Sequence, residues 1–111
     1  MNKYIIITTA TDKLDDVQIL QKALLDEKLA ACIQVSEINS HYNWNNERLE
    51  SKEYLLTIKT KKFLFKDVEK LIKEKHSYEL PEIISYDITN ISEDFAKWID
   101  NNTRKDDLEW I

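Results

Sequence analysis

The chain has 111 residues, of which 42% are apolar and 33% are charged, so it can bury one hydrophobic core and a second domain is not expected. It contains no glycine. This excludes a phosphate-binding loop, a dinucleotide-binding turn and a glycine-flanked nucleophile elbow, because each needs glycine where the backbone approaches a ligand. Sixteen basic and 21 acidic residues give a net charge of −5, which makes nucleic acid a poor partner.

Cysteine content and hydropathy limit the compartment in which we expect the protein. Cys32 is the only cysteine, so an intrachain disulfide and a multi-cysteine zinc site are excluded, and a reducing compartment fits best. The N-terminal apolar run, residues 4–7, is too short for a secretory signal, and no run of about 18 apolar residues could span a membrane. We therefore predict one cytoplasmic globular domain, residues 1–111, with no membrane contact.

The N-terminal part of the chain predicts a strand followed by a helix. The β-branched apolar run Tyr4–Thr9 is typical of a strand buried on both faces. Apolar residues at helical spacing predict a helix over Leu14–Lys28, with Asp12 as its capping residue. Asp15 and Asp16 complete an acidic patch at the helix start, to which we assign only capping and a favourable interaction with the helix dipole.

The middle of the chain predicts a long hairpin. Alternating apolar and polar residues indicate a second strand over Ala30–Trp44, and a third strand returns over Leu49–Lys61. Asn45 and Asn46 are predicted to make the turn, because asparagine tolerates the left-handed backbone region better than any other residue of a chain without glycine.

The remaining elements decide the predicted fold class. A second helix over Phe63–Lys75, a fourth strand over Glu82–Thr89 and a third helix capped by Ser92 follow. This order predicts an α+β fold of the ferredoxin-like type, a βαββαβ sandwich with a long β-hairpin and a C-terminal helix. The helices should cover one face of the sheet. We expect the apolar part of the other face to meet another chain, so that the protein forms oligomers.

The densest cluster of reactive side chains spans His76–Glu82, between the second helix and the fourth strand. Imidazole, phenol and carboxylate groups together could bind a divalent metal or transfer protons. The sequence by itself favours a structural interpretation, in which His76 closes the helix, Tyr78 packs and Pro81 sets the entry to the strand. The reason is that the cluster matches no metal-ligand spacing.

Three candidates lie outside that cluster. Cys32 alternates with Ile33 and so lies on the sheet face away from the helices, where a thiolate could take a soft cation such as Cu(I). A small hydrophobic side chain buried at a subunit contact is the favoured alternative for Cys32. Lys59 could neutralise an anion, although a surface lysine is the simpler interpretation. Tyr42 and Trp44, near the hairpin tip, are more often packing or interface residues than ligands.

Several short motifs, taken together and in order, resemble the CutA family of divalent-cation tolerance proteins. They are Ala31-Cys32-Ile33-Gln34, Tyr42-Asn43-Trp44, Glu53 with Leu56, Ile58-Lys59-Thr60, His76-Ser77-Tyr78-Glu79-Leu80-Pro81-Glu82-Ile83 and Trp98-Ile99. The resemblance implies a ferredoxin-like protomer in a tight homotrimer, similar to the PII signalling proteins, with the hairpin reaching over a neighbour. It also implies tolerance to copper and other divalent metals, metal binding, and no enzymatic reaction.

The resemblance also transfers candidate site residues. The implied metal ligands are Cys32, His76, Tyr78, Glu79 and Glu82, and the implied cleft-lining residues are Lys59 and Trp44. Two departures from the family pattern concern this site. Asn45-Asn46 stands where the family has glycine beside the hairpin tryptophan, and Ser77 stands where it has proline after the histidine.

Three functions follow as hypotheses. The leading one is a cytoplasmic trimer that binds copper or another divalent cation in clefts between subunits. The second is a PII-like module whose cleft senses a small anionic metabolite through Lys59. The third, an acylphosphatase-like hydrolase on the same fold, lacks a glycine-lined phosphate loop with an arginine in it.

Overall fold

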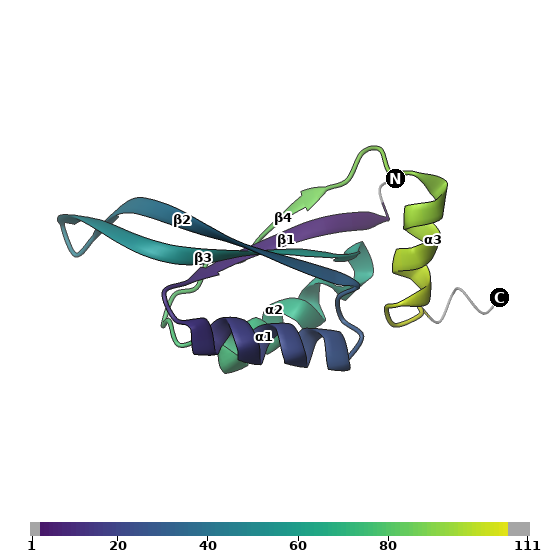
Figure 1. Ribbon diagram of the computed structural model, residues 1–111, viewed down its shortest axis with the longest axis horizontal. Coiled ribbons are helices and arrows are strands. Elements are labelled where there is room, and N and C mark those ends of the chain that lie inside the picture. Colours follow the sequence, from purple (N-terminus) through teal and green to yellow (C-terminus); the bar gives the residue numbers. More distant parts are fainter. Residues whose placement is uncertain (1–2, 107–111) are drawn as a thin grey trace.

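The computed structural model describes residues 3–106 and shows an α+β, ferredoxin-like fold (Figure 1). A four-stranded antiparallel sheet has the order β2-β3-β1-β4, and helices α1 and α2 lie side by side on one of its faces. The predicted fold class and order of elements are therefore confirmed. In chain order the elements are β1 (Tyr4–Thr11), α1 (Leu14–Asp26), β2 (Cys32–Trp44), β3 (Glu47–Lys61), a 3₁₀ turn (Lys62–Leu64), α2 (Phe65–Lys75), β4 (Ile84–Asp87) and α3 (Glu93–Asn101).

The start of α1 differs from the prediction. Asp12 does not cap the helix; Lys13 is the N-cap residue, and its side chain makes no capping hydrogen bond. The Thr11 hydroxyl instead accepts from the backbone N–H of Lys13 at 3.2 Å and donates to the Asp16 carboxylate at 2.6 Å. Asp16 is drawn inward by this contact and is 5% exposed, so assigning it to capping alone was wrong.

The ends of several elements also shift. Helix α1 ends at Asp26, two residues early, because the chain turns through a left-handed residue at Lys28, with φ 54°. Asn45 and Asn46 have φ values of 51° and 65°, which confirms the predicted turn and matches hairpins whose two turn residues both have positive φ. The Ser92 cap is confirmed, since its hydroxyl accepts from the Phe95 N–H at 3.2 Å.

The hydrophobic core lies between the sheet and helices α1 and α2. Strand residues Ile7 and Ile58 are paired across β1 and β3, and both are fully buried. Leu20 of α1 and Ile72 of α2 are also fully buried and belong to the same core cluster. Burying an aliphatic side chain of this size contributes about 1.5–3 kcal/mol, so this layer fixes the orientation of the sheet on the helices.

The other face of the sheet is only partly covered. Register places Cys32 beside Lys59 and Lys59 beside Ile6, all on the side away from α1 and α2. Helix α3 packs at one end of this face, where the Tyr4 hydroxyl donates to Asp100 at 2.9 Å. Further along β4, the apolar residues Ile84 and Tyr86 remain 46% and 55% exposed. An apolar surface without a cover in the single chain was predicted and is confirmed.

The hairpin extends well beyond the sheet. Strands β2 and β3 pair from Cys32↔Lys59 out to Trp44↔Glu47, whereas the pairing of β3 with β1 ends at Thr11↔Tyr54. The outer part of the hairpin is therefore a two-stranded ribbon, visible on the left of Figure 1, and the described chain measures 52 × 26 × 21 Å. Among the described helices, none has the length and apolar character that crossing a membrane requires.

Candidate functional site

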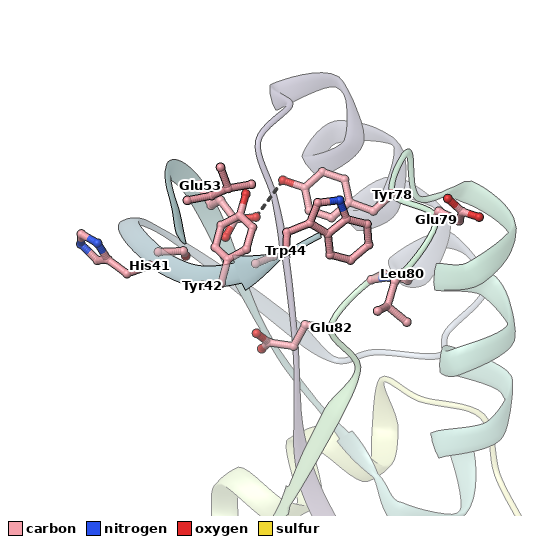
Figure 2. A pocket seen from close by; sticks show the side chains of 12 residues that line it. His41, Tyr42, Trp44, Glu53, Tyr78, Glu79, Leu80 and Glu82 are labelled. Carbon is pink, nitrogen blue, oxygen red and sulfur yellow. Dashed lines mark hydrogen bonds between the residues drawn. The ribbon is translucent and has the colours of Figure 1, made fainter. Parts of the chain in front are cut away.

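A cleft of about 830 Å³ lies between the projecting hairpin and the segment that follows α2 (Figure 2). One wall comes from β2 and β3, the other from residues 78–82, and Ala10 at the end of β1 contributes between them. The cleft exists because the hairpin extends past the end of β1. Its lining residues are Ala10, Ser40, His41, Tyr42, Trp44, Leu49, Glu53, Tyr78, Glu79, Leu80, Pro81 and Glu82.

The hairpin wall is aromatic. Tyr42 and Trp44 are two residues apart on β2 and so share a face, and Leu49 is the cross-strand partner of Tyr42. The Tyr42 hydroxyl lies 2.7 Å from the Ser51 hydroxyl, which fixes the position of the ring. Trp44 remains 45% exposed. This half of the cleft therefore offers two large side chains with exposed ring area.

His76 lies next to the opposite wall, residues 78–82, and its hydrogen bonds hold that segment in place. Its backbone N–H donates to the Ile72 carbonyl at 2.8 Å, so it closes α2 as the structural interpretation predicted. The ring Nδ1 lies 3.0 Å from the Tyr78 N–H and must accept that bond. The Nε2–H then donates to the Ala10 carbonyl at 2.8 Å, which corresponds to a neutral imidazole with both nitrogens in use. A metal ion at His76 would have to displace one of these bonds.

Asp16 ties the same segment to the start of α1. Its carboxylate accepts from the Ser77 hydroxyl at 2.5 Å and from the Ser77 N–H at 3.3 Å, in addition to Thr11. Burial acts to raise the pKa of Asp16, but hydrogen bonds from Ser77 and Thr11 outweigh it, and the pKa lies below its ordinary value. Ser77 thus anchors the loop by hydrogen bonding.

Two carboxylates of the cleft are held by neutral hydroxyl donors. The Tyr78 hydroxyl donates to Glu53 at 2.7 Å, drawn as a dashed line in Figure 2, and Thr8 donates to Glu82 at 2.7 Å. Burial and the neighbouring Glu53 raise the pKa of Tyr78 above its ordinary value of 10.0, so the phenol keeps its donor proton even in mildly alkaline solution. The carboxylates are oriented without being neutralised. Glu79 completes the acidic lining.

Cys32 and Lys59 lie elsewhere on the open face. Lys59 is six residues from Glu53 along β3, which places it roughly 20 Å from the acidic part of the cleft. Its ammonium donates to Gln34 at 2.9 Å and lies 5.8 Å from the centre of the Phe95 ring. Cys32 is the cross-strand neighbour of Lys59 and is half-buried.

The structure thus divides the predicted site residues into two groups within one chain. Trp44, Tyr78, Glu79 and Glu82 line the cleft with His76 behind them, whereas Cys32 and Lys59 are at the other end of the sheet. Within residues 3–106, no three His, Cys, Asp or Glu side chains lie close enough together to hold a metal ion.

Sequence reasoning assigned Asp16 only to the start of the helix, and it gave Thr8 and Glu53 no role in the site. Asp16 could have been found from its spacing, because it lies on the same helical stripe as the buried residues Leu20 and Leu24. Thr8 and Glu53 carry no comparable signal, since their partners are 74 and 25 residues away in the sequence.

Comparison with known proteins places the chain in a family. The sequence model described as CutA1 divalent ion tolerance protein matches residues 4–102. The divalent-cation tolerance protein CutA of Pyrococcus horikoshii is 34% identical over 101 residues, covering 91% of this chain and 99% of that protein. Its counterpart from Thermus thermophilus is 32% identical over 104 residues, covering 93% and 99%.

Solved structures agree with the sequence comparison. The crystal structure of CutA1 from Shewanella sp. SIB1 has a TM-score of 0.89 at 30% identity, covering 94% of this chain and 98% of that one. A crystal structure of CutA1 from Pyrococcus horikoshii has a TM-score of 0.87 at 33% identity, covering 91% and 99%. The chain belongs to the CutA1 divalent ion tolerance protein family.

Proposed function

We propose that residues 1–111 form one CutA-like domain that serves tolerance to divalent cations by binding such a cation in the hairpin cleft, without catalysing a reaction. The observation that carries this proposal is the charge of the cleft. Glu53, Glu79 and Glu82 line it, and its twelve described lining residues include neither lysine nor arginine. Carboxylate oxygens are the ligands that hard divalent ions prefer.

The cleft residues fit part of a cation site. Glu79, Glu82 and the phenol oxygen of Tyr78 supply oxygen ligands from one chain, and Trp44 closes the hairpin side. His76 could join them only by giving up a bond to Ala10 or Tyr78. The thiolate of Cys32 is a suitable ligand for copper, but it could reach this site only from another copy of the chain. Lys59 could likewise line the cleft only from another copy.

Assembly into a homotrimer would bring these groups together in clefts between subunits. Two features support it. The open sheet face leaves Ile84 and Tyr86 exposed, and the ribbon projects beyond the core of its own chain. A ribbon of two strands is marginal in water unless something packs against it, so a neighbouring copy would stabilise it.

The test is calorimetric titration of the purified protein with Cu(II), Zn(II) and Mg(II), together with its molar mass in solution. A trimer that binds one of these ions, with at least about tenfold weaker binding in an E79Q/E82Q double variant, is expected. E93Q is the matched control, because Glu93 is exposed on α3 outside the cleft. Equal affinity in the double variant, or a monomer in solution, would contradict the proposal. C32S tests the thiolate separately with Cu(I).

The anionic-metabolite hypothesis has less support, because Lys59 is absent from the cleft lining and already bonds Gln34. A thermal-shift screen of anionic metabolites against metals would detect it, since a ligand of the native state raises the midpoint. Turnover of an acyl phosphate would be needed to favour the hydrolase.

We propose the cytoplasm as the compartment, on the basis of a single half-buried cysteine. Some relatives are named for other compartments. The Arabidopsis thaliana protein is called chloroplastic, and the Archaeoglobus fulgidus structure is described as periplasmic. Fractionation of the source cells would test this.

A further inference from the structure

The hairpin cleft has the volume and the lining to bind an organic ligand in addition to a metal ion. Its volume of about 830 Å³ lies within the range of pockets that bind organic molecules. A divalent metal ion with its ligands at about 2.0–2.6 Å would occupy only a small part of it. We infer that the cleft binds an organic ammonium ion, with aromatic rings packed around its alkyl groups and carboxylates facing its charge.

Three aromatic rings line the cleft from two walls. Tyr42 and Trp44 come from the hairpin and Tyr78 from the segment after α2, and Figure 2 shows all three at the cleft. The hydroxyls of Tyr42 and Tyr78 are held by Ser51 and Glu53, so these rings have defined positions. The electron-rich faces of tryptophan and tyrosine attract ammonium groups, and tryptophan does so most strongly.

The charge of the cleft selects a cation. In the described part of the chain, Glu53 and Glu82 accept hydrogen bonds from Tyr78 and Thr8, both neutral donors, so their negative charge remains uncompensated. Among the described lining residues, His41 is the one that is basic, and its ring is directed to Glu50, 3.1 Å away. Glu79 adds a third carboxylate.

The apolar residues give an alkylated ammonium contacts that a hydrated metal ion does not make. Leu49 lies on the hairpin wall, and Leu80 and Pro81 lie on the opposite wall. Leu80 is 72% exposed, which is an unfavourable state for a leucine side chain and one that contact with an alkyl group would relieve. Aromatic rings, aliphatic groups and carboxylates in one cleft match the three parts of such a ligand.

The test is titration of the full-length protein, in its solution assembly, with benzyltrimethylammonium chloride. Benzyl alcohol and sodium benzoate serve as the neutral and anionic probes at the same ionic strength. Binding of the ammonium at least about fivefold tighter than that of either other probe is expected. W44L should weaken it by about fivefold, and E79Q should weaken it as well. W98L is the control, because Trp98 has nearly the same exposure, 43%, but lies on α3.

Equal affinity for the three probes, an equal effect of W98L and W44L, or no ammonium binding by the wild-type assembly would each overturn the inference. Absence of ammonium binding would overturn it even if the cause is a neighbouring copy that fills the cleft. The metal titrations are independent of these measurements. Metal binding without ammonium binding would overturn this inference alone, and the reverse would overturn the proposed metal-binding function alone.

Discussion

Replacing Asp16 with asparagine should destabilise the protein through the loop that forms one wall of the cleft. The carboxylate receives three hydrogen bonds, two from Ser77 and one from Thr11, and Asp16 is 5% exposed. All three bonds end on one carboxylate oxygen, Oδ2, so asparagine can keep their geometry with its amide oxygen, but it removes the charge. The bonds from Ser77 and Thr11 would then end on a neutral acceptor and be weaker.

The size of the effect follows from the number of bonds weakened. A hydrogen bond to a charged group contributes about 1.5–3 kcal/mol and one between neutral groups about 0.5–1.5 kcal/mol, so each of the three weakened bonds costs up to about 1 kcal/mol. We therefore expect Asp16→Asn to lower the free energy of unfolding by roughly 2 kcal/mol at neutral pH. Asp15→Asn is the matched control, because Asp15 is the exposed neighbour on the same helix turn, and it should stay within about 0.5 kcal/mol of wild type.

The assay is urea unfolding at one fixed protein concentration, repeated across pH, because an oligomer's apparent stability depends on concentration. The pKa of Asp16 in the folded protein lies below its ordinary value of 3.8. Its stabilising effect is therefore complete above the unfolded-state pKa and is lost as the pH falls through the folded-state pKa. The difference between wild type and Asp16→Asn should be constant above about pH 5 and shrink below about pH 4.

Two results would refute this reasoning. If Asp15→Asn costs as much as Asp16→Asn, removal of any negative charge near the helix start is responsible, and the buried contacts are not. If the difference between wild type and Asp16→Asn persists unchanged at low pH, the ionised form of Asp16 is not the source of the stabilisation.

Three other substitutions test separate parts of the fold. Lys61→Met should loosen the segment that follows α3, because the buried ammonium of Lys61 lies 3.1 Å from the Arg104 carbonyl. Amide hydrogen exchange in residues 93–106 should therefore become faster. Lys62→Met is the control, because that side chain is 57% exposed, and it should leave the exchange unchanged. Asn46→Gly should raise the free energy of unfolding by about 0.5–1 kcal/mol, as φ is 65° there, and a loss of stability in urea would contradict the turn geometry. Tyr78→Phe should cost about 1 kcal/mol, and in wild-type protein the Tyr78 phenol should ionise last in an ultraviolet pH titration, because burial and Glu53 raise its pKa.

The fold could be predicted from the sequence because local patterns decide it. The β-branched run at residues 4–9 and the alternation along residues 32–44 reflect which side chains face the core, and Asn45-Asn46 was the available solution to the turn. The start of α1 was mispredicted because Thr11, and not Asp12, bonds the Lys13 N–H just before the helix. Thr11 also donates to Asp16, which is held in turn by Ser77, 61 residues away.

The candidate site was predictable only in part, for a related reason. Residues 76–82 are contiguous, so the sequence alone indicates that they lie together on one wall of the cleft. It also indicates that Trp44 lies near the tip of the hairpin. The sequence alone does not indicate which side chains of other strands contact residues 76–82. The partners of Tyr78 and Glu82 are Glu53 and Thr8, chosen by the register of β3 and β1, and Cys32 proved to be at the other end of the sheet.

The projecting ribbon means that the two walls of the cleft are held differently. Residues 76–78 are fixed to the body of the chain through Asp16 and the Ala10 carbonyl, whereas Tyr42 and Trp44 are carried on two strands beyond the reach of β1. Ligands that contact both walls would therefore hold the ribbon in place, as the Tyr78–Glu53 hydrogen bond already does at one point. In the proposed trimer, a ligand that orders the ribbon would also favour packing of a neighbouring copy against it, and by linkage that packing would favour ligand binding.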